Sequence, residues 1–181
     1  MRSITITGKH NIDELNKIEN HTYQSVRKNM VFLNEHTVNH AKQVQLIREL
    51  YMNIDATLLD ATLLENTIKS RLQRELLAKL QGYKQQDMHK DIHHHDTLIT
   101  LEDVLEKLVG SKLACCYCSK PILVLYKNVR EPLQWTLDRI NNDLSHTKEN
   151  TCIACLKCNL QRRCMDAKKF TFTKKLKINK V

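Results

Sequence analysis

Two cysteine pairs are the residues of this chain whose type and spacing most directly indicate chemistry. They are Cys115 with Cys118 and Cys155 with Cys158, each pair in a Cys-x-x-Cys spacing. Such a pair presents two thiolates at the separation that a tetrahedral zinc ion requires. A plain zinc ribbon usually has about 15–20 residues between its pairs, and the insert here is about twice that length. The spacing therefore predicts a structural Zn²⁺ site that encloses a further functional segment.

The other cysteines leave the second pair open. Cys152 stands three positions before Cys155, so the second zinc pair could be Cys152 with Cys155 instead of Cys155 with Cys158. Buried cysteines can also serve as small apolar side chains without any metal. We expect no metal role for Cys116 and Cys164.

The enclosed segment carries side chains that could bind a second, harder ion. Residues 134–137 predict a strand that delivers Asp138 at its end. The chain from Thr151 onward predicts a helix on which Cys155 and Asn159, four positions apart, lie on one face. A carboxylate oxygen and an amide oxygen are ligands that suit Mg²⁺ or Mn²⁺. Asp138 and Asn159 are therefore candidate ligands of one such ion.

On these residues the chain resembles the HNH, or ββα-metal, nuclease family, in the zinc-stabilised form found in viral, phage and mobile-element nucleases. That family has an Asp-His pair at the end of its first strand, an Asn after the loop, and Cys-x-x-Cys-Asn with a basic residue soon after. The matching positions here are Asp138-Arg139, Asn150, and Cys155 to Asn159 followed by Arg162 and Arg163. The resemblance covers residues 115–163.

The resemblance implies a fold, a reaction and a set of roles. The fold is a hairpin and a helix that clamp one divalent ion, and the reaction is hydrolysis of a DNA phosphodiester with Mg²⁺ or Mn²⁺. By this resemblance Asp138 and Asn159 hold the catalytic ion. Asn150 pins the loop, and the four paired cysteines bind structural zinc.

The chain departs from the family at the general base. The family has a histidine after the aspartate, whereas this chain has Arg139, which cannot accept a proton. We hypothesise that His146, on the loop between Asp138 and Asn150, activates the water, while Arg139 binds the scissile phosphate through its planar guanidinium. His146 could equally make only a structural hydrogen bond within the loop.

A basic excess indicates a polyanionic partner. The net charge is +9, and lysine and arginine dominate the last quarter of the chain. In the basic tail, apolar residues at 170, 172, 176 and 178 alternate with polar ones, which predicts a further strand at 170–178, with a solvated terminus as the alternative. We expect contact with nucleic acid, most simply DNA, with salt-dependent affinity. The candidate contact residues are Arg162, Arg163, Lys168, Lys169, Lys174 and Lys175.

The first half of the chain predicts helices. Three glycines and two prolines in 181 residues favour long helices over a turn-rich β architecture. Helical periodicity predicts one helix opening at Asn11, a second over residues 38–54 and a third ending near Tyr83, followed by a polar linker at 85–96 that contains a histidine cluster. A further helix is predicted to begin after Thr100.

The predicted fold class is mainly α with a small α+β module. Residues 1–96 form a helical bundle and linker, and residues 97–181 a zinc-bound ββα-metal domain with a basic tail. We expect no signal peptide and no membrane span. Seven cysteines without a signal peptide suit a reducing compartment such as cytoplasm, nucleus or virion.

Two functions follow from the sequence. The first is an HNH endonuclease, and the alternative is a non-catalytic nucleic-acid-binding zinc module within a viral, transcription or ribosomal assembly. In either case the N-terminal helices could dock a protein partner or self-associate.

Overall fold

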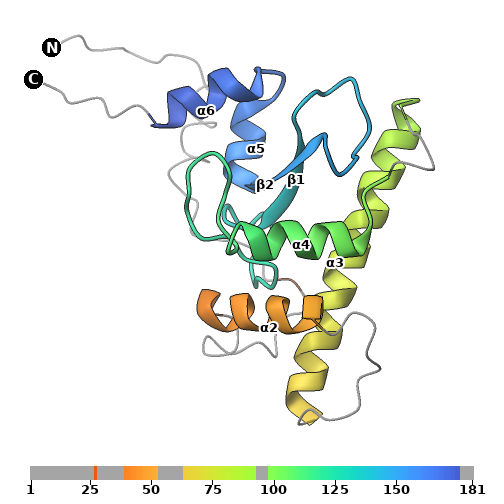
Figure 1. Cartoon of the computed structure of the whole chain (residues 1–181), viewed down its shortest axis with the longest axis vertical. Coiled ribbons are helices and arrows are strands. Elements are labelled where there is room, and N and C mark those ends of the chain that lie inside the picture. The colour runs from red at the N-terminus through yellow and green to blue at the C-terminus, as the bar shows by residue number, and fades with distance from the viewer. Residues whose placement is uncertain (1–26, 28–38, 53–62, 93–97, 176–181) are drawn as a thin grey trace, which may run out of the picture.

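The computed structural model describes Arg27 and residues 39–52, 63–92 and 98–175 (Figure 1). The helix predicted to open at Asn11 and the histidines at 93–95 lie outside these residues. In chain order the described elements are α2 (His40–Met52), α3 (Leu63–His89), α4 (Leu101–Gly110), β1 (Trp135–Arg139), β2 (Thr151–Cys155), α5 (Leu156–Arg162) and α6 (Ala167–Lys175).

The described part of the chain is mainly α-helical, with one two-stranded antiparallel sheet. This agrees with the coarser part of the predicted fold class. Figure 1 shows α4 between the β1–β2 hairpin and α2, with the long α3 running alongside. Among the helices described, none is both long enough and apolar enough to cross a lipid bilayer.

One hydrophobic cluster joins the helices to the hairpin. Each helix contributes apolar residues at helical spacing, so that its buried face meets the others at the centre of the molecule. Buried members of the cluster include Leu46, Ile47, Leu72, Leu76, Val104, Leu108, Trp135 and Ile153. The helices before residue 97 and the chain after it therefore share a core.

The start of α4 follows the sequence prediction. Thr100 is the N-cap: its hydroxyl accepts the Asp103 N–H at 3.2 Å, and the Asp103 carboxylate accepts the Thr100 N–H at 3.0 Å. This reciprocal capping box satisfies two backbone donors that a helix start otherwise leaves unpaired.

The hairpin confirms one prediction and overturns another. β1 forms where a strand was predicted, but residues 151–155 form β2 rather than a helix, and α5 begins only at Leu156. Thr151 and Ile153 are β-branched and buried, and β2 pairs with β1 so that Asp138 stands opposite Cys152. Pairing and burial of these residues favour the extended conformation.

The apolar run at residues 122–126 is typical of a strand, yet no strand forms there. Its backbone groups bind a side chain instead: the amide oxygen of Gln43, fully buried on α2, accepts the N–H groups of Val124 and Leu125 at 2.8 and 2.9 Å. The Gln43 Nε2 donates to the Leu125 carbonyl at 3.0 Å. A side chain of α2 therefore satisfies groups that a neighbouring strand would otherwise pair.

The helix α3 extends beyond its predicted end. Residues 85–89, expected to begin a polar linker, are the last turn of α3. Asp87 in this turn is fully buried and bonded to the loop that carries His146. Tertiary contacts thus stabilise the helical conformation of residues 85–89, whose polar composition predicted a linker.

Residues 167–175 form the helix α6, whereas alternation predicted a strand over residues 170–178, of which 176–178 lie outside the described residues. Within α6, Ala167 and Phe170 are buried, three positions apart, whereas Phe172 is exposed. Phe170 packs edge-on against Tyr117 with ring centroids 5.0 Å apart. Phe170 is thus buried on the same helix face as Ala167, while Phe172 points to solvent. A strand would instead place Phe170 and Phe172 on one face.

We predict that Gln43→Leu lowers the free energy of unfolding by about 3 kcal/mol, because it leaves the buried N–H groups of Val124 and Leu125 without an acceptor. Urea denaturation of the zinc-loaded chain measures the change. The matched control is Gln45→Leu on the same helix, whose exposed amide bonds Glu49 alone among the residues described, and it should change stability by less than about 0.5 kcal/mol. Equal losses in both variants would contradict the role of Gln43.

Candidate functional site

The four paired cysteines lie together. The Sγ atoms of Cys115, Cys118, Cys155 and Cys158 are all within 4.8 Å of one another, and those of Cys118 and Cys155 are 3.9 Å apart. Sulfurs bound to a tetrahedral zinc at about 2.3 Å are about 3.8 Å from each other. The group therefore has the donor type, number and spacing to hold a metal ion such as zinc.

Two short turns place these sulfurs. After α4 the chain turns back at Ser119, which has a φ of 57°, and the Ser119 N–H donates to the Cys115 carbonyl at 2.9 Å. On the other side, Cys155 ends β2 and is the N-cap of α5, where its Sγ accepts the Cys158 N–H at 3.4 Å. Each cysteine pair is thus shaped by its own backbone turn.

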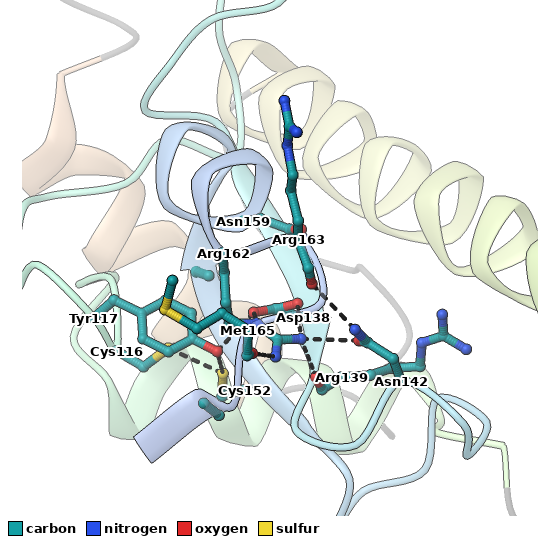
Figure 2. A network of polar contacts seen from close by, with 12 residues as sticks. Cys116, Tyr117, Asp138, Arg139, Asn142, Cys152, Asn159, Arg162, Arg163 and Met165 are labelled. Atoms are coloured by element: carbon teal, nitrogen blue, oxygen red, sulfur yellow. Dashed lines mark hydrogen bonds and ion pairs between the residues drawn. The ribbon is translucent and has the colours of Figure 1, made fainter. Parts of the chain in front are cut away.

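Cys152 lies outside this group. Its Sγ is 3.0 Å from that of Cys116 and 3.5 Å from the hydroxyl of Tyr117 (Figure 2). The four-sulfur group uses Cys158 instead, so the alternative pairing of Cys152 with Cys155 is not the one that the structure forms. Cys164 is exposed and is likewise outside the group.

A pocket of about 590 Å³ lies between α3, β1, the loop after β1 and α5. The four residues predicted for the catalytic site all line it: Asp138, Arg139, His146 and Asn159. They come from a strand, a loop and a helix, and the hairpin and α5 bring them to the same cavity.

The Asp138 carboxylate is buried and hydrogen-bonded on both oxygens (Figure 2). Its Oδ2 accepts from the Arg162 Nε and the Tyr117 hydroxyl, both at 2.6 Å, and its Oδ1 accepts from the Arg162 Nη2 at 2.9 Å. Arg162 thus grips the carboxylate with two nitrogens, the strongest geometry for such a pair. Desolvation opposes the charge of Arg162, but the contact with Asp138 raises the net pKa of its guanidinium.

Arg162 therefore does not face solvent, and its prediction as a nucleic-acid contact is wrong in this structure. It is 2% exposed, and it also donates to the carbonyls of Arg139 and Met165. The neighbouring Arg163 is exposed and lines the pocket. On α6, Lys168 and Lys169 are exposed and Lys174 is half-buried, whereas the side chain of Lys175 lies outside the described part of the chain.

Asn159 lines the same pocket as Asp138 and offers an acceptor that no described residue uses. Its Nδ2 donates to the Thr136 hydroxyl at 3.1 Å, and its amide oxygen has no hydrogen-bond partner within the described residues. A carboxylate offers about four acceptor positions, of which Asp138 uses three, so one position on Oδ1 remains. By donor type this pair fits a hard divalent ion, although Arg162 already balances the charge of the carboxylate.

The side chain of Asn150 ties the loop after β1 to the start of β2. Its Oδ1 accepts the Asn141 N–H at 2.9 Å, while its Nδ2 donates to the carbonyls of Asn141 and Ser145 at 2.9 Å. The loop that carries His146 is therefore closed by one amide at both of its ends.

His146 is held by an aspartate that is not among the predicted site residues. Asp87 on α3 accepts the His146 backbone N–H at 2.7 Å and contacts its Nδ1 at 2.7 Å, and Tyr83 packs on the ring with centroids 4.7 Å apart. Asp87 follows Leu76, Leu80 and Tyr83 on the apolar face of α3. That spacing is the one signal in the sequence that could have indicated burial of this carboxylate.

The cations around the pocket exceed its anions. Arg139 donates through Nη1 to the Leu144 carbonyl at 3.2 Å and lies 3.5 Å from Asp87, and its Nε and Nη2 bond none of the residues described. Lys90 and Arg163 are exposed at the rim. Burial, aided by Arg27, lowers the pKa of Lys79 to about 7, so this fourth cation is only partly charged at neutral pH.

Comparisons with protein-family models, with curated proteins and with solved structures gave no match. The resemblance to HNH nucleases therefore rests on the motif residues between 115 and 163 and on their arrangement in the structure.

We predict that the purified chain contains one zinc ion, because the four sulfurs form one group. Cys158→Ser should lose the zinc and fall in melting temperature, since structural zinc contributes directly to folding free energy. Metal analysis by mass spectrometry with parallel thermal melts measures both quantities. Cys164→Ser is the control and should keep one zinc; loss of zinc from Cys152→Ser, with Cys158→Ser unaffected, would restore the other pairing.

We predict that Arg162→Met lowers the free energy of unfolding by about 3–5 kcal/mol, because it leaves the buried Asp138 carboxylate without its counter-charge. Arg163→Met removes the same side chain from the next position, where it is exposed, and should cost less than about 0.5 kcal/mol. Denaturant unfolding in zinc-containing buffer compares the two. Similar values for both variants would show that the Asp138–Arg162 pair does not stabilise the fold.

Proposed function

We propose that this protein is a metal-dependent nuclease of the HNH kind that hydrolyses DNA phosphodiester bonds. One observation supports the proposal above the others. Asp138, Arg139, His146 and Asn159, chosen from the sequence for a catalytic site, line one pocket, and the helix that carries Asn159 also carries Cys158 of the four-sulfur group. The order β1, β2, α5 matches the strand–strand–helix unit of a ββα-metal domain.

The charges around the pocket suit a phosphodiester. The unbonded nitrogens of Arg139 form a planar fork that matches two phosphate oxygens. Arg163 and Lys90 at the rim, with Lys168 and Lys169 on α6, extend positive charge for contacts to neighbouring phosphates. Binding through these groups is independent of base sequence.

Asp138 and Asn159 are the residues that would hold a divalent ion. Such an ion would supply charge neutralisation at the scissile phosphate and polarisation of a phosphoryl oxygen. Thr136 orients the Asn159 amide, and Arg162 with Tyr117 fixes the carboxylate of Asp138. The two oxygen ligands are thus held by neighbours rather than left to rotate, as a catalytic site requires.

His146 is the residue of the pocket that could take the proton from the attacking water. Burial lowers the pKa of its imidazole, and Asp87 acts in the opposite direction. Because the net direction is downward, the ring is neutral at neutral pH and can accept a proton. Arg139, which replaces the family's histidine, is left to bind phosphate.

A second function is favoured by a specific contact. Arg162 already occupies both oxygens of Asp138, which is the arrangement expected where a metal-binding carboxylate has become structural. In that case the chain is a nucleic-acid-binding zinc module within a larger assembly. All seven cysteines are free, so either function suits a reducing compartment.

We predict that the zinc-loaded chain nicks supercoiled plasmid when Mg²⁺ or Mn²⁺ is added, and not in its absence. His146→Ala should slow nicking by about 100- to 10,000-fold, because a general base is lost. Asn159→Ala should reduce it to background. Single-turnover gel assays measure the rates, with zinc content checked in every sample.

The matched control is Lys157→Ala, an exposed residue of the same helix outside the pocket, which should nick as the wild type does. Full activity in His146→Ala or Asn159→Ala would reject these assignments. A wild-type chain that binds DNA with a steep salt dependence but never nicks it would establish the second function instead.

A further inference from the structure

We infer that Asp87 is the positioning residue of His146: it holds the ring proton on Nδ1 and leaves the Nε2 lone pair as the proton acceptor at the pocket. The inference rests on the proposed function for its consequence in catalysis, but the state of the ring is a property of the free protein. It gives α3, which the sequence predicted as part of a helical bundle, a part in the site.

The contacts between the two residues fix the ring from two directions. Asp87 is fully buried, its Oδ2 accepts the His146 backbone N–H at 2.7 Å, and its Oδ1 lies 2.7 Å from the ring Nδ1. One carboxylate therefore spans the backbone and the side chain of the same residue. Rotation of the ring about its side-chain torsions would break the second bond while the first still holds the backbone.

The carboxylate also fixes the tautomer. An ionised aspartate only accepts hydrogen bonds, so Nδ1 must carry the proton that it donates to Asp87. In a neutral imidazole the other nitrogen then has the lone pair. Among the described residues, Nε2 of His146 has no hydrogen-bond partner, and His146 lines the same pocket as Asp138 and Asn159.

Neighbouring groups hold the rest of the residue. Tyr83, from the preceding turn of α3, packs on the ring at an interplanar angle of 35°. The His146 carbonyl accepts the Ile99 N–H at 2.9 Å, and Thr147 bridges to Leu98. Different contacts therefore fix the backbone of His146, the plane of its ring and the position of the ring proton. A proton acceptor in a catalytic site has to be held in this way.

The carboxylate at this position does more than close the loop. A buried charge is costly unless it is paired, and a neutral amide could close the loop at lower cost. The charged groups near Asp87 are Arg139, whose Nη1 is 3.5 Å away, and the titratable His146 itself. What an aspartate provides, and an amide does not, is acceptors on both oxygens and hence a defined tautomer.

The experiment uses the full chain with zinc bound and ¹⁵N-labelled histidine. Long-range ¹H–¹⁵N spectra report which ring nitrogen carries the proton, and His146→Gln identifies the signals of His146 among nine histidines. We expect the Nδ1–H tautomer in the wild type. In Asp87→Asn the amide oxygen has to accept the His146 backbone N–H, so the NH₂ faces Nδ1 and the Nε2–H form should appear, and kcat for plasmid nicking should fall about 100-fold with little change in KM.

Glu75→Gln is the matched control, because Glu75 is another buried carboxylate of α3 that pairs with Arg71 and lies outside the pocket. It should leave the tautomer and kcat unchanged. A wild-type ring protonated on Nε2, or an Asp87→Asn variant with wild-type tautomer, overturns the inference. If the wild type cleaves no DNA, the proposed nuclease fails, while the spectra still decide whether Asp87 sets the ring of His146.

Discussion

The convergence of four sulfur atoms is the constraint on which the rest of the C-terminal structure depends. Cys115 and Cys118 belong to the turn after α4, and Cys155 and Cys158 belong to the junction of β2 and α5. One metal ion held by all four would therefore fix the start of α5 relative to the α4 turn. The two-stranded sheet is too small to be stable alone, so this fixation decides where β1 presents Asp138.

A buried ion pair completes what the sulfur group begins. The bidentate contact of Arg162 with Asp138 joins the end of α5 to the end of β1, so the helix is held at its first turn by Cys158 and at its last by Arg162. The same contact limits the chemistry of the pocket. Asp138 already balances the charge of Arg162 and has one acceptor position left for a cation. This limit bears on the choice between a nuclease and a non-catalytic zinc module more directly than the presence of Arg139 in place of the family's histidine.

The sequence predicted best where a residue's role is set by local spacing. The cysteine group follows from two short pairs, and the capping box of α4 from Thr100 and Asp103. Prediction failed where distant contacts decide. Residues 151–155 are extended because β1 pairs with them, and residues 122–126 form no strand because Gln43 takes the hydrogen bonds of Val124 and Leu125. Arg162 and Arg163 are adjacent residues of the same type. Only the orientation of α5 buries Arg162 against Asp138 and leaves Arg163 on the surface.

The contribution of α3 changes how the chain divides into functional parts. Lys79, Tyr83 and Asp87 stand at successive turns of one helix face, and all three reach the hairpin or its loop. The Tyr83 hydroxyl accepts the Leu137 N–H of β1 at 2.9 Å, beside the strand that carries Asp138. A zinc-bound hairpin and helix without α3 would therefore retain the candidate metal ligands but lose the groups that hold His146. One wall of the pocket is therefore formed by α3, which the residues of the HNH resemblance do not include, and α3 lines the candidate site as well as supporting it.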